Sequence, residues 1–201
     1  MSGPGSGRIG ALVLAAGEAR RMGRPKALLP LEGRTFLEIL LDRLGRAGVG
    51  PLVVVLGDAA AEIRAAVTLG DARVVINPDP GRGQLSSIHC GLDSLRPEEV
   101  DALFIAPVDT PRVRVETLSR MMASLSGHPL VVPSRRGRRG HPALFSASLF
   151  PALRGASPDR GARAVVQATV DRLEMETDDP SVLEDFDTPE DLARLEDRLP
   201  P

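Results

Sequence analysis

The chain has 201 residues and a formal net charge of −2, a length that suits one α/β domain with a substantial core and is short for two. This charge argues against a nucleic-acid-binding protein, whose binding face is usually strongly basic, and the sequence holds no run of about 18 apolar residues, so we expect no membrane span. The single cysteine, Cys90, cannot form an internal disulfide, which suits a reducing cytoplasm.

The chain begins with Met1-Ser2-Gly3-Pro4-Gly5-Ser6-Gly7, which lacks the apolar centre of a signal peptide. We expect residues 1–8 to be a disordered N-terminal lead. No linker or internal repeat divides the rest, so residues 9–201 are expected to form a single domain.

Apolar runs then alternate with helical patterns, which favours βαβ units in a three-layer α/β/α arrangement with a mostly parallel sheet. The main strands are expected at Ile9–Ala16, Leu52–Leu56, Arg73–Ile76 and Ala102–Ala106. Their nearly continuous hydrophobicity fits strands that are buried on both faces. Shorter strands are expected at Leu130–Val132, Ala143–Phe145 and Leu173–Glu176.

The first expected helix is Thr35–Ala47, with Thr35 as the N-cap and Glu38 as its capping-box partner. A last helix, Pro189–Leu199, would begin with proline at its first position. The other expected helices are Asp58–Leu69, Gln84–Leu95, Val115–Leu125 and Gly161–Val170.

A glycine-punctuated basic loop, Gly17 to Lys26, follows the first strand directly. Gly17 and Gly23 allow a close approach of bare backbone N–H groups to a phosphate, and Arg20, Arg21 and Lys26 supply positive charge. The spacing differs from that of a Walker A loop and from G-x-G-x-x-G, so neither a P-loop NTPase nor an NAD-type Rossmann enzyme is indicated.

Two carboxylate segments are candidates for a metal site. Asp109 comes just after a buried strand, where open α/β sheets place their ligands, and a carboxylate there can hold Mg²⁺. It could equally be a turn residue or the N-cap of the next helix. In Asp185-Phe186-Asp187-Thr188-Pro189, either Asp187 or Thr188 could simply cap the last helix.

Taken together, the L-A-A-G-x-x-x-R-M-G-x-x-K loop of residues 14–26 and these two segments resemble the molybdenum-cofactor nucleotidyltransferases, particularly their cytidylyltransferase branch. The resemblance runs from Val13 to Leu192. It implies a Rossmann-like, GT-A-like nucleotide-diphospho-sugar transferase fold and a Mg²⁺ cofactor held by Asp109 and Asp187. It also implies nucleotide-binding roles for Leu14, Ala15, Ala16, Gly17, Arg21, Lys26, Asn77, Gly83 and Ser87.

The acceptor side carries two further matches to the family. Arg139-Gly140-His141-Pro142 matches its R-G-H-P segment, which implies that Arg139 and His141 face the acceptor. The segment from Asp159 to Arg163 resembles a G-D-x-G-A-R stretch and implies an acceptor role for Arg163. Ser157-Pro158 departs from that pattern, so the role of Asp159 stays open.

The implied reaction transfers CMP from CTP to the terminal phosphate of molybdopterin and releases pyrophosphate, with catalytic roles for Arg21, Lys26 and Asp109. Guanylyltransferase relatives typically read L-A-G-G where this chain has Ala16, which favours cytidine. A molybdoenzyme that receives the product is a further expected partner. Three alternatives stay open: GTP as the donor, a sugar or polyol phosphate as the acceptor, and a nucleotide-binding chaperone of a molybdoenzyme without turnover.

The remaining candidates have simpler explanations. His89 and His128 belong to no recognisable site pattern and are expected to be structural or surface residues, and Cys90 is expected to be a small buried hydrophobe. His141 could also be an ordinary turn residue. The basic stretch from Arg135 to Arg139 fits either a solvated loop or an attractor for a phosphate or pterin-linked anion.

Overall fold

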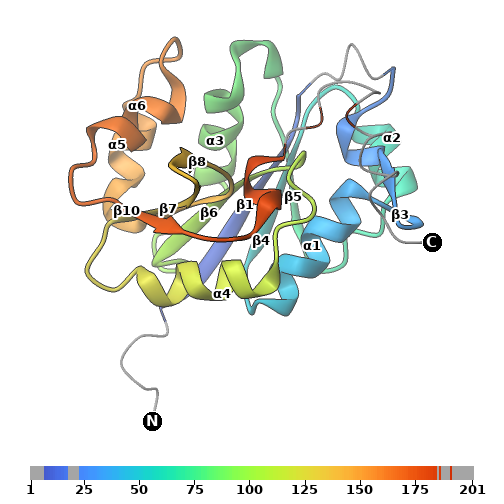
Figure 1. Cartoon of the computed structure of the whole chain (residues 1–201). Helices are drawn as coiled ribbons and strands as arrows, with labels where there is room; N and C mark the ends of the chain where they lie inside the picture. The colour runs from blue at the N-terminus through green and yellow to red at the C-terminus, as the bar shows by residue number, and fades with distance from the viewer. Residues whose placement is uncertain (1–6, 18–22, 185, 187–190, 192–201) are drawn as a thin grey trace.

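The computed structural model describes residues 7–17, 23–184, 186 and 191. A mixed sheet runs through its middle with helices on both faces (Figure 1). The strands lie in the order β10 (Leu173–Glu176), β7 (Leu130–Arg135), β9 (Ala143–Ser146), β6 (Ala102–Pro107), β1 (Ile9–Ala15), β4 (Leu52–Leu56) and β5 (Arg73–Ile76). Strand β8 (Arg138–Arg139) pairs with β7, and β2 (Pro30–Leu31) and β3 (Arg34–Thr35) form a separate hairpin.

The sheet is mostly parallel, as the sequence predicts. Strand β1 pairs in parallel with both β4 and β6, β4 with β5, and β7 with β10. Only β9, which lies between β6 and β7, and the short β8 run antiparallel to their neighbours. The carboxyl ends of β1, β4, β5, β6, β7 and β10 therefore meet along one edge of the sheet.

Helices cover both faces and complete the three layers that the sequence predicts. α1 (Phe36–Arg46) and α4 (Val115–Ser124) lie on one face, and α3 (Gln84–Asp93), α5 (Phe150–Arg154) and α6 (Gly161–Ala168) lie on the other (Figure 1). α2 (Ala60–Ala66) follows β4. Four 3₁₀ turns complete the described chain: η1 (Lys26–Leu28), η2 (Pro80–Arg82), η3 (Ala147–Leu149) and η4 (Pro180–Leu183).

Most helix boundaries agree with the prediction, and the differences have local causes. α2 ends three residues before the expected Leu69 because Val67 turns extended and buries its side chain in the core. α5 was not expected from the sequence. The predicted helix Pro189–Leu199, apart from Asp191, and the predicted lead at residues 1–8, apart from residues 7 and 8, lie outside the described residues.

The expected capping box begins α1. The Thr35 hydroxyl accepts the Glu38 N–H at 3.3 Å, and the Glu38 carboxylate accepts the Thr35 N–H at 2.8 Å. These bonds satisfy backbone donors at a helix start, which are otherwise unpaired.

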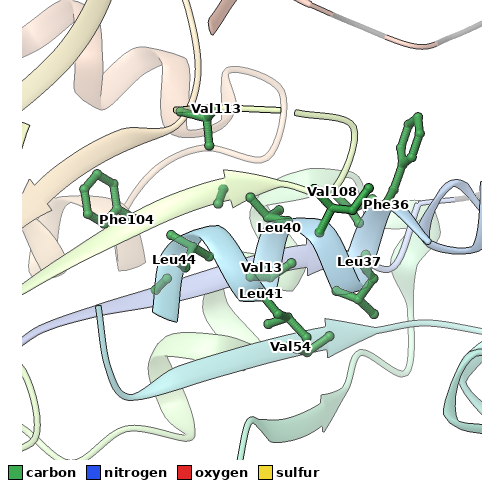
Figure 2. Close-up of a cluster of buried hydrophobic side chains, with 14 of the residues drawn as sticks. Val13, Phe36, Leu37, Leu40, Leu41, Leu44, Val54, Phe104, Val108 and Val113 are labelled. Carbon is green, nitrogen blue, oxygen red and sulfur yellow. The ribbon is translucent and has the colours of Figure 1, made fainter. Parts of the chain in front are cut away.

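Alternation along the central strands divides the core between the two faces. Val13, Val54 and Phe104 face α1, whereas Leu12 and Leu14 on β1 face α3. Figure 2 shows the leucines of α1, including Leu37, Leu40 and Leu44, directed onto the first of these faces. All of these side chains are fully or nearly fully buried, and each such aliphatic side chain contributes about 1.5–3 kcal/mol of transfer free energy.

Within the described ranges, no helix has the length and apolar character needed to cross a membrane.

Candidate functional site

A cleft of about 290 Å³ opens at the carboxyl edge of the sheet, between the ends of β1 and β6. The chain reverses direction across the sheet at this point, because β4 and β5 lie on one side of β1 and β6 lies on the other. Open α/β sheets place their ligands at such a switch point. The cleft is lined by Leu14, Ala15, Ala16, Gly17, Lys26, Ala27, Pro80, Gly83, Gln84, Ser87, Pro107, Val108 and Asp109.

Parallel pairing brings the end of β1 and Asp109 together. The last residue pair of the β1–β6 ladder is Leu14 and Pro107, and the Val108 N–H then donates to the Leu14 carbonyl at 3.1 Å. This bond continues the ladder by one step and sets Asp109 at the mouth of the cleft.

Close packing after β4 holds the residue that follows β1. A Cβ atom on Gly57 would lie 2.7 Å from the Ala16 carbonyl oxygen, so only glycine fits at this position without displacing Ala16. The position of Ala16 thus depends on a residue 41 positions further along the chain.

An ion pair crosses the cleft. The Lys26 ammonium, at the start of η1, donates to the Asp109 Oδ2 atom at 2.9 Å. The two side chains are only 18% and 23% exposed, so the pair is partly shielded from solvent. A cation for phosphate oxygens therefore lies directly beside a carboxylate that could hold a divalent metal.

The N-terminus of α3 forms another wall of the cleft. Gly83 precedes it with φ of 87°, a conformation that favours glycine, and no side chain among the described residues caps the helix. The first backbone N–H groups of an uncapped helix, together with its dipole, favour an anion.

Asn77 holds this wall in place. It follows β5 with 2% of its surface exposed, and its amide donates to the hydroxyls of Ser86 at 2.8 Å and Ser87 at 3.0 Å. Its Oδ1 atom accepts the Asp79 N–H at 2.9 Å. Asn77 lines a neighbouring cleft rather than this one, and Ser87 is the residue that reaches the site.

The R-G-H-P turn lies at the same edge of the sheet, after the β7–β8 hairpin. The Gly140 N–H donates to the Pro133 carbonyl and the His141 N–H donates to the Val182 carbonyl, both at 2.8 Å. A Cβ atom on Gly140 would overlap the Val182 carbonyl, so the turn and η4 are in direct backbone contact.

The basic stretch from Arg135 to Arg139 forms a hairpin that contacts β10 and the residues that follow it. Arg139 pairs with Glu174 at 2.6 Å, and this hydrogen bond raises the pKa of the Arg139 guanidinium. The Arg136 N–H donates to the Glu176 carboxylate at 2.8 Å, and the Arg135 guanidinium donates to the Asp178 carbonyl at 3.4 Å. These contacts give the stretch a defined structure, in contrast to a wholly solvated loop.

Several predicted site residues lie elsewhere. Arg163 is exposed on α6 and does not line the cleft, and Asp159 is exposed in the segment before it. Arg21 and Asp187 lie outside the described residues. Within the described part of the chain no three His, Cys, Asp or Glu side chains form a metal-binding group, and Asp109 is the one carboxylate among the described residues that line the cleft.

His89 and His128 have structural or surface surroundings, as predicted, whereas Cys90 is half-buried and not buried as expected. A ring nitrogen of His89 contacts the Leu153 carbonyl at 3.0 Å, and one of His128 contacts the Asp171 carbonyl at 3.2 Å. Burial, with a smaller effect of the Asp93 charge, raises the pKa of the Cys90 thiol, which disfavours the nucleophilic thiolate.

Two residues of the cleft wall had no signal in the sequence. Pro80 lies in the 3₁₀ turn η2 and Ala27 in η1, and these two turns bring them to the cleft. Gln84 could have been singled out, because it is the first helical residue after Gly83.

Comparison with known proteins adds independent information. A family model described as the MobA-like NTP transferase domain matches residues 11–173. The chain is 34% identical to nicotine blue oxidoreductase of Paenarthrobacter nicotinovorans, over 92% of this chain and 94% of that one. It is 32% identical to the molybdenum cofactor guanylyltransferase of Rhodobacter capsulatus, over 96% of this chain and 97% of that one.

A cytidylyltransferase and a solved structure are also similar. The molybdenum cofactor cytidylyltransferase of Escherichia coli K12 is 24% identical, over 94% of this chain and 96% of that one. The crystal structure of the manganese complex of Rv0371c from Mycobacterium tuberculosis superposes with a TM-score of 0.82 at 30% identity. The superposition covers 96% of this chain and 100% of that one.

Proposed function

The chain belongs to the family of MobA-like NTP transferase domains, and on that premise we propose that it is a Mg²⁺-dependent cytidylyltransferase. The proposed reaction transfers CMP from CTP to the terminal phosphate of molybdopterin and releases pyrophosphate. The observation that carries this proposal is the Lys26–Asp109 pair, 2.9 Å long, at the switch point of the sheet.

The cleft has the features that a triphosphate needs. Uncapped backbone N–H groups at the start of α3 and the Lys26 ammonium both favour anions, and they line the same space. Ser87, held by Asn77, offers a hydroxyl for the ribose or base.

The donor set suits Mg²⁺. This ion is typically bound in proteins by one or two carboxylates together with substrate phosphates and water. Asp109, partly exposed in the cleft, would be one ligand, and Asp187 is proposed as the second. Bound there, the ion would polarise phosphate oxygens and stabilise charge in the transition state.

Positioning and charge carry the rest of the mechanism. An oxygen of the acceptor phosphate attacks the α-phosphorus of CTP while the bond to the β-phosphate oxygen breaks, and pyrophosphate leaves. The acceptor phosphate is already anionic near neutral pH, so no strong general base is required. Lys26, with Arg21, is proposed to balance the charge on the leaving pyrophosphate, and Arg139, His141 and Arg163 are proposed to face the acceptor.

The choice of CTP rests on Ala16, where guanylyltransferases typically carry glycine. The relatives do not decide it, because both a guanylyltransferase and a cytidylyltransferase align over nearly the whole chain. Two other substrate pairs are therefore assayed beside the proposed one: GTP with molybdopterin, and CTP with a sugar or polyol phosphate.

The first test is a thermal-shift panel with CTP, GTP, ATP and UTP, each with and without Mg²⁺. Ligand at about 100 times its Kd stabilises a protein by about 2.7 kcal/mol, which shifts the melting temperature by several degrees in a domain of this size. A Mg²⁺-dependent shift with CTP alone supports the proposal. A larger shift with GTP than with CTP would make GTP the donor. The absence of a shift with every nucleotide would refute the proposal.

The second test measures pyrophosphate release with molybdopterin. Stoichiometric pyrophosphate distinguishes nucleotidyl transfer from the redox activity that the name of the Paenarthrobacter relative denotes. Binding of CTP without pyrophosphate release would instead indicate a nucleotide-binding chaperone of a molybdoenzyme.

A further inference from the structure

Asp179 is the one ionisable residue that is buried within the part of the chain that the structure describes, with 1% of its surface exposed. Burial alone would raise its pKa, but hydrogen bonds from Ser181, the Arg114 N–H and Thr117 lower the pKa overall. The carboxylate therefore stays charged in the core at neutral pH. None of the motifs that predict the active site includes it.

One oxygen of Asp179 holds the start of α4. Oδ2 accepts the Arg114 N–H at 2.9 Å and the Thr117 hydroxyl at 2.8 Å. Arg114 is the N-cap residue of α4 and its side chain makes no cap hydrogen bond. Its own N–H has no partner within the helix, and the carboxylate of a distant segment accepts it near the positive end of the helix dipole. This contact fixes the far end of residues 109–114, the loop that begins with Asp109.

The near end of the same loop is fixed to the sheet. The Val108 N–H donates to the Leu14 carbonyl at 3.1 Å, and the Thr110 hydroxyl donates to the Pro107 carbonyl at 2.9 Å. The loop is thus held between β6 and Asp179, and the Asp109 side chain projects from it into the cleft.

The other oxygen of Asp179 holds η4, which supports the R-G-H-P turn. Oδ1 accepts the Ser181 N–H at 3.0 Å and the Ser181 hydroxyl at 2.6 Å. The next residue, Val182, accepts the His141 N–H and closes the space above Gly140. A change in η4 would therefore move His141 directly.

We propose that Asp179 is a positioning residue that fixes the Asp109 loop and the His141 turn relative to one another. The proposal rests on the proposed function, in which Asp109 serves the metal and His141 faces the acceptor. The nucleotide-binding wall at α3 and Asn77 has no contact with this carboxylate, so the two sides of the cleft are supported independently.

The variant Asp179→Asn keeps the shape of the side chain but turns one oxygen into an N–H donor. That donor would face either the Ser181 N–H or the Arg114 N–H, so the hydrogen bond of the side chain to η4 or the one to α4 must be lost. The matched control is Asp178→Asn, because the neighbouring Asp178 side chain is 93% exposed and lies 3.8 Å from Arg114.

With CTP, Mg²⁺ and molybdopterin, Asp179→Asn is expected to lower kcat and to raise the acceptor KM, each by about tenfold, because small misplacements of reacting groups carry large penalties. The Mg²⁺ concentration for half-maximal activity should rise as well. CTP binding without metal should stay within about twofold of wild type, a change well under 1 kcal/mol, because the Asp109 charge stays beside Lys26 and the wall at α3 has no contact with Asp179. Asp178→Asn should match wild type in all of these constants.

Hydrogen–deuterium exchange gives a readout that does not depend on turnover. Exchange in peptides covering residues 109–117 and 138–142 should increase together in Asp179→Asn, whereas peptides covering residues 77–90 should not change. If wild type releases no pyrophosphate, the proposed function fails, and these exchange data still decide the role of Asp179.

Two results would overturn the positioning role. One is exchange in Asp179→Asn that equals that in Asp178→Asn in either segment. The other is a lower melting temperature with unchanged kinetic constants below it, which would make Asp179 a stability element only. If Asp179→Asn does not fold, Thr117→Val removes a single hydrogen bond to Asp179 and should produce smaller changes in the same direction.

Discussion

Replacement of Asp109 by asparagine should have opposite effects on metal-free nucleotide binding and on turnover. The variant keeps an oxygen near the Lys26 ammonium but removes the negative charge from the cleft. Without metal, an anionic triphosphate should therefore bind more tightly, because it no longer meets a carboxylate and no longer competes with one for Lys26. With Mg²⁺, turnover should fall, because a metal ligand is lost.

The size of the first effect follows from the geometry. At an effective dielectric constant of about 20, two unit charges 2.9 Å apart attract by about 6 kcal/mol. Solvent and desolvation offset most of this, because the two side chains are still 18% and 23% exposed. A net gain of about 1–2 kcal/mol remains, which corresponds to metal-free affinity about 5- to 30-fold tighter than that of wild type.

The second effect is larger and has the opposite sign. Loss of the metal ligand should lower kcat by at least about 100-fold, or about 2.7 kcal/mol of transition-state stabilisation. The assays are CTP titration by calorimetry in the presence of a chelator and pyrophosphate release with saturating Mg²⁺. Asp178→Asn is a suitable control, because that side chain is 93% exposed and lies outside the cleft. A near-wild-type rate in Asp109→Asn would refute the metal role, and unchanged metal-free affinity would refute the competition for Lys26.

Three further predictions follow from the cleft walls and the buried carboxylate. Gly83→Ala should destabilise the protein by about 1–3 kcal/mol and weaken CTP binding, because alanine is strained at φ of 87°. The control is Gly81→Ala, which should have the melting temperature and the CTP affinity of wild type, because Gly81 does not have a positive φ. Asn77→Ala should lower the free energy of unfolding by about 1–3 kcal/mol, because buried hydrogen-bond partners, including Ser87, lose their contacts; an unchanged urea midpoint would contradict this. The pKa of Asp179 lies below its ordinary value of 3.8, so its contribution to stability is present above that pH and is lost as pH falls through the folded-state pKa. Urea unfolding from pH 5 to 2 should therefore show a shallower acid decline in Asp179→Asn than in wild type, and equal slopes would argue against the shift.

Local features of the fold could be predicted from the sequence because their causes are short-range. The Thr35–Glu38 capping box involves residues three positions apart, and both of its hydrogen bonds form as expected. The strands Leu52–Leu56 and Arg73–Ile76 have the predicted bounds, because short runs of Val, Ile and Leu favour extended backbone. The expected burial on both faces is wrong for Arg73–Ile76, because this strand lies at the edge of the sheet and its residues are half-buried or exposed. The end of α2 was misplaced because the burial of Val67 is a tertiary effect.

In the candidate site, too, the sequence predicts the residue types but not their arrangement. Its residue types follow from motifs: a basic loop after the first strand, Asp109 after the strand Ala102–Pro107, and the R-G-H-P turn. Their arrangement does not, because Lys26 and Asp109 are 83 residues apart and meet only through the pairing of β1 with β6.

The sequence by itself thus determined most of the secondary structure and the chemistry available to the site, since helix caps, hydrophobic runs and glycine loops act over a few residues. Tertiary structure alone decided that Glu174 pairs with Arg139, and that Asp179 caps a helix 65 residues away while holding the turn of His141 through η4. These contacts depend on strand order and on the close packing of distant segments, and no local pattern of residues encodes either one.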